Sequence, residues 1–106
     1  MTYTISLVES GVIRLAISGA LDARTAVDLR STLHRLLSRR PPYVDVDLAG
    51  VHMIDTIGVG TLIGFYKRLT AKAGVVTFSN VRDQPLLIFK VLGLDRLFVA
   101  YGAAAH

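Results

Sequence analysis

The sequence contains no cysteine among its 106 residues. This absence excludes disulfides, thiolate metal sites, cysteine nucleophiles and thiol redox switching in this chain. Long apolar runs are also missing, since no uninterrupted stretch approaches the ~20 residues of a membrane-spanning helix, and the N-terminus has no basic segment followed by an apolar one. We therefore expect a soluble, cytoplasmic protein that does not enter the membrane. A chain of this length can bury one core without metal or disulfides, so we expect a single domain over residues 1–106.

Acidic residues are few, with 8 Asp and Glu against 12 Lys and Arg, which leaves a formal net charge of +4. The basic residues are dispersed, and the one local cluster, Arg35, Arg39 and Arg40, comes just before Pro41-Pro42. Cations are favourable there, because a preceding helix would place the negative end of its dipole at this point. Aromatic residues that could stack on bases are not interleaved with the basic ones. We expect no direct binding of nucleic acid. Binding of an acidic protein partner is an alternative that the charge leaves open.

Converging catalytic groups are hard to find. His34, His52 and His106 are isolated from one another, so no pair has the spacing of metal ligands. Asp45 and Asp47 fall on one face of a predicted strand, as a general acid and base pair would. We interpret them instead as solvent-facing charges on the open side of the sheet. We therefore predict no catalytic residue, no metal site and no cofactor.

Hydrophobic periodicity predicts alternating strands and helices. Period-two alternation predicts strands over 3–7, 13–17, 44–48 and 76–78, and a short last strand over 97–101; Gly19 is expected to end the second of them. Apolar residues at three- and four-residue steps predict helices between 22 and 41, 56 and 74, and 83 and 93. Because the strands alternate instead of being apolar throughout, helices should cover mainly one face. The fold class is α/β, with a mixed sheet of four or five strands.

The first and last predicted helices have recognisable starts. Asp22 or Thr25 is the candidate cap of the first, whose apolar stripe contains Ala26, Leu29, Leu33, Leu36 and Leu37. The last begins as a capped turn at Asp83-Gln84-Pro85. Its buried side should consist of Leu87, Ile88, Val91 and Leu92.

The stretch from Val51 to Leu69 is the centre of the pattern, because an apolar strand turns abruptly into a helix there. Asp55 is a good N-cap, since its side chain can accept hydrogen bonds from the first helical turn, and Thr56 would open the helix. The helix then carries three glycines off its apolar row, and each costs roughly 1 kcal/mol relative to alanine. Three glycines within seven residues, Gly58, Gly60 and Gly64, indicate that something packs closely against this helix end.

This corner allows several interpretations. The glycines approximate a phosphate-binding loop, but they lie inside the helix and no Lys-Ser/Thr pair follows them. Asp55-Thr56 is similar to an aspartic protease motif, but Ile57 displaces the next glycine and no second copy exists. What remains is an exposed threonine hydroxyl beside an acidic residue. It is either just part of a capped helix or a docking surface that phosphorylation would switch.

Four segments carry a resemblance to a known family: Gly19–Asp22, Ile54–Gly60, Gly64–Arg68 and Gly93–Phe98. In residues and spacing they resemble the anti-sigma factor antagonist family, the small bacterial STAS domains. The corner motif is the specific part, and together the segments cover nearly the whole chain.

The resemblance implies a non-enzymatic regulator of transcription in a stress response. In the family, the unmodified antagonist binds an anti-sigma factor that is also a serine/threonine kinase, which frees a sigma factor. The kinase phosphorylates the hydroxyl residue after the motif aspartate and so breaks the complex, and a metal-dependent serine/threonine phosphatase resets it. On this chain the acceptor would be Thr56. The partner-binding residues would be Asp22, Asp55, Thr56, Ile57, Gly58 and Gly60, and we also expect a weak homodimer.

Two other roles stay open. Serine is the usual acceptor in the family, whereas threonine occurs in stress-complex relatives and in STAS subunits of lipid-transport ATPases. The chain could therefore be a scaffold component of a stress complex, or an unphosphorylated STAS subunit docked on a transporter ATPase.

Overall fold

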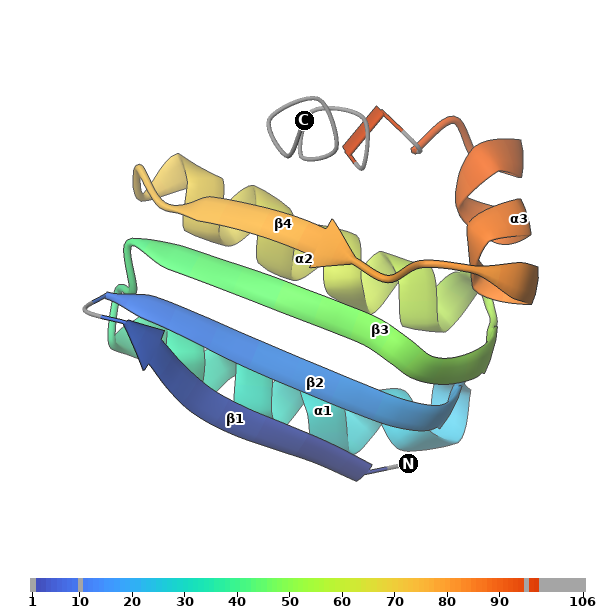
Figure 1. Cartoon of the computed structure of the whole chain (residues 1–106), viewed down its shortest axis with the longest axis horizontal. Coiled ribbons are helices and arrows are strands. Elements are labelled where there is room, and N and C mark those ends of the chain that lie inside the picture. Colours follow the sequence, from blue (N-terminus) through green and yellow to red (C-terminus); the bar gives the residue numbers. More distant parts are fainter. Residues whose placement is uncertain (1, 10, 95, 98–106) are drawn as a thin grey trace.

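The computed structural model describes residues 2–9, 11–94 and 96–97. Strands and helices follow one another in the predicted order (Figure 1). The elements are β1 (Thr2–Glu9), β2 (Val12–Leu21), α1 (Ala23–Ser38), β3 (Tyr43–Ile54), α2 (Thr56–Ala71), β4 (Val75–Ser79) and α3 (Asp83–Val91). Of the predicted last strand, Leu97 lies in a helical turn and 98–101 fall outside the described residues.

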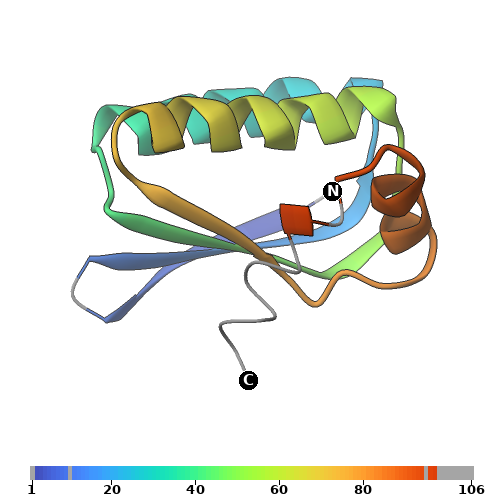
Figure 2. The ribbon, with the colours of Figure 1, turned by 90° about the horizontal axis from the view of Figure 1, so that it is seen from above.

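The four described strands form one mixed sheet in the order β1-β2-β3-β4. β1 pairs with β2 in antiparallel fashion, whereas β2 with β3 and β3 with β4 are parallel. Helices α1 and α2 lie side by side on one face of the sheet, and α3 lies at the end where β3 finishes (Figure 2). The predicted mixed sheet, with its helices mainly on one face, is confirmed.

The core lies between the sheet and the α1/α2 layer. The predicted stripe of α1 is buried, and α2 buries Val59, Leu62, Phe65 and Leu69. Burial contributes roughly 1.5–3 kcal/mol for each such side chain, so these four outweigh the roughly 3 kcal/mol that three glycines cost the helix. Packing, more than intrinsic propensity, therefore stabilises α2.

The prediction that Gly19 ends the second strand is wrong. β2 continues to Leu21, and its pairing with β3 shifts register between Ala16 and Ser18 and again after Gly19, whose φ is 98°. Glycine adopts this conformation without the cost that a side chain would add. The strand thus bends and still reaches the edge where the two helices begin.

The predicted buried side of the last helix is also wrong in part. Ile88 packs against the core, but Leu87, Val91 and Leu92 are 61%, 72% and 46% exposed. The ring of Phe89 inserts beside Phe78, with centroids 6.0 Å apart, and fixes the rotation of α3. Pro85 is in the first turn as predicted, but the N-cap is Arg82 and no side chain caps the helix.

Asp45 is not the solvent-facing charge that the strand pattern suggested, because its side chain is only 6% exposed. It accepts hydrogen bonds from the hydroxyls of Thr77 (2.8 Å) and Ser79 (2.9 Å) and pairs with Arg14 at 3.3 Å. These partners come from the strands on either side of β3. Asp45 therefore ties the open face of the sheet together, and its oxygens are occupied by structural partners. Asp47 is half-buried and accepts from Asn80 at 2.9 Å.

Replacing Asp45 by alanine should destabilise the fold, because Arg14 and the Thr77 hydroxyl would lose a shared partner in a buried position. We expect Asp45→Ala to lower the free energy of unfolding by about 2–4 kcal/mol. Urea denaturation measures this loss, and Asp47→Ala on the same strand is the matched control with an expected loss of about 1 kcal/mol. Equal losses at the two positions would contradict the structural role of Asp45.

Candidate functional site

Two helix N-termini lie next to each other at one edge of the sheet. β2 and β3 are parallel neighbours, and their last residues, Leu21 and Ile54, are paired in the sheet. Each strand is followed at once by an aspartate and then a helix, with Asp22 before α1 and Asp55 before α2. The parallel pairing therefore brings together two predicted site residues that are 33 positions apart in the sequence.

Asp22 caps α1. Its carboxylate accepts hydrogen bonds from the backbone N–H groups of Arg24 (3.0 Å) and Thr25 (3.1 Å). The Thr25 hydroxyl accepts in return from the backbone N–H of Asp22 at 2.9 Å, which completes a capping box. The bond from the Thr25 backbone is the main reason that the pKa of Asp22 lies below its usual value of 3.8, and the Arg24 backbone adds to the shift.

The capping role of Asp22 predicts an acid-dependent part of the stability. Because the pKa is lowered in the folded state, the carboxylate contributes stability above the unfolded pKa of about 4 and loses that contribution as pH falls through the folded pKa. Asn can cap without a charge, so Asp22→Asn should be less stable than the wild type at neutral pH, and the difference should vanish in acid. Thermal unfolding at a series of pH values tests this. A difference that stays constant or grows on acidification would contradict it.

Asp55 joins the two helices. One carboxylate oxygen accepts from the backbone N–H of Gly58 at 2.8 Å and so caps α2, as predicted. The other accepts from the backbone N–H of Ala23, in the first turn of α1, at 3.2 Å. The backbone N–H of Asp55 itself donates to the carbonyl of Leu21 at 3.2 Å. These bonds fix the position of the N-terminus of α1 relative to that of α2.

The three glycines of α2 do not share one role. Gly58 is buried, and a Cβ on it would collide with the carbonyl oxygen of Leu21 and lie 2.9 Å from Cγ1 of Ile54. The close packing expected against this helix end is confirmed at Gly58. A Cβ on Gly60 would meet nothing within 4 Å, and one on Gly64 would meet only the Arg68 guanidinium at 3.7 Å. Gly60 is exposed, whereas Gly58 lies beneath the surface that Thr56 and Ile57 form.

Thr56 and Ile57 form the exposed part of the corner. Thr56 is the first residue of α2 and is exposed, and the Ile57 side chain is 44% exposed. Within the described part of the chain, neither the Thr56 hydroxyl nor the backbone N–H groups of these two residues have a hydrogen-bond partner. A free hydroxyl thus stands at the positive end of a helix dipole, where added negative charge is favourable.

Gln84 belongs to the support of this corner and was not identified as such from the sequence. Its side-chain amide accepts from the backbone N–H of Ile54 at 2.9 Å and donates to the Ile54 carbonyl at 3.0 Å. The last residue of β3, directly before the Asp55 cap, is thereby fixed to α3. Local patterns could not reveal this bond, because its two residues are 30 positions apart.

A metal-binding cluster and a membrane-spanning helix are both absent from the described residues. No group of three or more His, Asp or Glu side chains there could hold a metal ion. In the same part of the chain, no helix has the length and apolar character to cross a bilayer.

Comparisons with known proteins show the family to which this chain belongs. The sequence model of one family, the STAS domain, matches residues 4–104. The chain belongs to the STAS domain family. Among the curated relatives of this STAS protein is an anti-sigma F factor antagonist from Paenibacillus polymyxa, 25% identical over 92 residues that cover 86% of this chain and 79% of the relative.

Solved structures show the same fold. An anti-sigma factor antagonist from Mycobacterium paratuberculosis superposes with a TM-score of 0.79 and 24% identity, covering 92% of the STAS chain described here and 81% of the other. The Bacillus cell fate determinant SpoIIAA in its phosphorylated form superposes with a TM-score of 0.70 and 18% identity, covering 91% and 87%. Both support the predicted STAS architecture of this chain.

Proposed function

We propose that this STAS protein is an anti-sigma factor antagonist whose binding to its partner is switched by phosphorylation of Thr56. The observation that carries the proposal is the free, exposed hydroxyl of Thr56 at the start of α2, beside the Asp55 cap. The names of the relatives supply the partner class, an anti-sigma factor. The protein itself acts in the cytoplasm and performs no catalysis.

The unmodified corner is suited to a tightly packed complex. Asp55 and Gly58 keep the turn compact, and Thr56 and the half-exposed Ile57 lie at its surface. Gly60, one turn further along α2, leaves open space. The proposed contact surface contains Asp22, Asp55, Thr56, Ile57 and Gly60, with buried Gly58 supporting it from below.

Phosphorylation would change this surface by charge and by bulk. In the proposed step, the Thr56 hydroxyl oxygen attacks the terminal phosphorus of ATP held by the partner kinase. A P–O bond forms, ADP leaves, and the hydroxyl proton passes to the kinase. The phosphate adds about −1.5 to −2 charges next to the carboxylates of Asp22 and Asp55. A metal-dependent phosphatase would hydrolyse the ester and release inorganic phosphate.

The free protein can tolerate a phosphate that the complex cannot. In the free protein, the unpaired N–H groups of Thr56 and Ile57 and the adjacent N-terminus of α1 offset the added charge. In a closely packed complex the same phosphate would be desolvated beside two carboxylates. The modification therefore penalises the complex more than the free chain, which is what a switch requires.

Co-purification tests the partner class. The tagged protein, expressed in the cells from which it comes, should retain an anti-sigma factor with a serine/threonine kinase domain, identified by mass spectrometry of the bound fraction. Recovery of a lipid-transport ATPase without an anti-sigma factor would overturn the proposal in favour of a transporter subunit. Recovery only within a large assembly of other STAS proteins would overturn it in favour of a scaffold role.

A further inference from the structure

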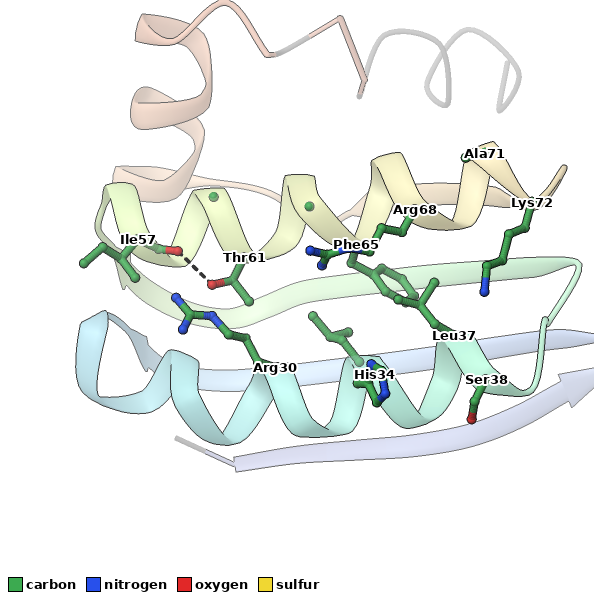
Figure 3. Close-up of a pocket in the computed structure, with 13 residues that line it drawn as sticks. Arg30, His34, Leu37, Ser38, Ile57, Thr61, Phe65, Arg68, Ala71 and Lys72 are labelled. Atoms are coloured by element: carbon green, nitrogen blue, oxygen red, sulfur yellow. Dashed lines mark hydrogen bonds between the residues drawn. The ribbon is translucent and has the colours of Figure 1, made fainter.

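A groove of about 950 Å³ runs between α1 and α2 (Figure 3). Its floor consists of side chains that are almost fully buried, Leu33, Leu37 and Phe65. Gly60 and Gly64 lie along the α2 side and leave the groove open, and Ile57 stands at the end nearest the Thr56 corner. The groove is therefore a surface feature that extends away from the proposed switch.

Positive charge is concentrated in this groove. Arg30 contributes from α1, and Arg68 and Lys72 contribute from the α2 side. Arg30 extends toward Thr61 on α2, and Lys72 extends from the other end toward α1 (Figure 3). Among the residues that the structure describes, no acidic one lines the groove, and all 16 residues of α2 are free of Asp and Glu.

The spacing of the cations indicates an elongated occupant. Arg30 extends toward Thr61, and Lys72, the C-cap of α2, comes 11 residues after Thr61, a distance of ~16 Å at 1.5 Å per residue. A ligand with a single anionic group could pair with one end of the groove only. Carboxylates on one side of a helix can recur every three or four residues, and a row of them over about three turns spans the same ~16 Å.

The volume fits the same occupant. A helix of about four turns, ~22 Å long and ~10 Å across, occupies roughly 1,700 Å³. The groove of about 950 Å³ is smaller than such a helix, so one side of the helix would stay in solvent. An amphipathic helix meets this requirement, because one of its sides contacts the partner and the other stays hydrated.

We propose that the groove between α1 and α2 binds an acidic amphipathic helix of a protein partner. A second copy of this chain does not supply one, since among its described helices α1 contains one acidic residue, Asp28, and α3 contains one, Asp83. Single-stranded nucleic acid fits less well, because it binds by stacking on aromatic faces and the Phe65 ring is only 1% exposed. The binding is chiefly electrostatic and therefore weakens with salt.

Nuclear magnetic resonance titration tests this proposal without the natural partner. The probe is a synthetic helical peptide of about five turns with glutamates on one side, spaced three and four residues apart, and leucines beside them. Added to the isotope-labelled full chain, it should shift the backbone resonances of groove residues in α1 and α2. The same peptide with lysine in place of glutamate is the charge control, and an oligothymidylate is the nucleic-acid arm.

Two neighbouring residues of α2 provide matched variants. Arg68 lines the groove and Lys67 does not, although both are exposed cations. Arg68→Glu should weaken peptide binding by about tenfold, and Lys67→Glu by less than about twofold. Equal effects of the two variants, shifts scattered over the surface, or no groove shift with the acidic peptide would overturn the proposal. So would groove shifts with only the lysine peptide or only the oligonucleotide. Neither variant alters Thr56, so the phosphorylation switch succeeds or fails independently of this test.

Discussion

Thr56→Glu is expected to weaken binding of the anti-sigma factor by about 100-fold or more, equivalent to roughly 3 kcal/mol. The glutamate places a fixed negative charge and extra bulk where the partner must approach closely, next to the carboxylates of Asp22 and Asp55. The fold should stay intact, because Thr56 is exposed and an acidic residue suits the first turn of a helix. Isothermal titration calorimetry of the purified pair measures the affinity, and circular dichroism checks the fold.

Thr70→Glu is the matched control for this variant. Thr70 is also exposed and lies on the same helix, but in its last turn, where its hydroxyl donates to the Tyr66 carbonyl at 2.8 Å. We expect Thr70→Glu to retain the affinity of the wild type within about threefold, because the change is remote from the corner. Unchanged affinity of Thr56→Glu, or an equal loss in both variants, would show that the Thr56 surface is not the docking site.

Gly58→Ala and Gly60→Ala should change stability in opposite directions. The added methyl at position 58 would overlap the Leu21 carbonyl and crowd Ile54, so we expect a loss of about 2 kcal/mol or more in the free energy of unfolding. At position 60 the methyl meets nothing within 4 Å, and alanine favours the helix by about 0.5–1 kcal/mol. The two variants differ only in which glycine of one helix carries the same methyl group.

Urea denaturation of both variants measures these changes. The prediction for Gly58 also has a structural consequence, because the Leu21 carbonyl that it packs against accepts the hydrogen bond from Asp55. Displacement of that carbonyl should disturb the corner and reduce partner binding along with stability. A stabilised Gly58→Ala, or a Gly60→Ala variant that loses stability, would contradict the packing described for α2.

Features that depend on local sequence could be predicted well. The cap at Asp55, the start of α2 at Thr56 and the Asp22 cap of α1 depend on side-chain and backbone groups within three residues of each other. The buried stripe of α1 follows directly from helical periodicity. The parallel pairing of helix-separated strands then places Asp22 and Asp55 at the same edge, so most of the corner could be deduced before the structure.

Features that depend on distant partners could not be predicted in this way. Asp45 occupies a polar position in the alternating pattern of β3, which predicts a solvated side chain. Only the register with the neighbouring strands shows that Thr77, Ser79 and Arg14 surround it. The rotation of α3 is set by Phe89 against Phe78 and by Gln84 against Ile54. A helix with apolar residues on more than one side does not reveal which side will be buried.

The glycines of α2 show a third limit of prediction from the sequence. Composition signalled that α2 was unusual, but it could not separate Gly58, where the Leu21 carbonyl excludes a side chain, from Gly60, where space is open. The open space becomes informative only together with Arg30, which the fold brings to it from α1. The α1/α2 groove was therefore not predictable from the sequence alone.

The most direct test of the switch is to treat the purified protein with its cognate kinase and ATP and then measure both its intact mass and its affinity for the anti-sigma factor. We predict one added phosphate, mapped by fragmentation to Thr56, and an affinity reduced as far as in Thr56→Glu. The Thr56→Val variant should take up no phosphate under the same conditions. Phosphate on another residue, no phosphate at all, or a phosphorylated protein that binds its partner as tightly as before would contradict the account.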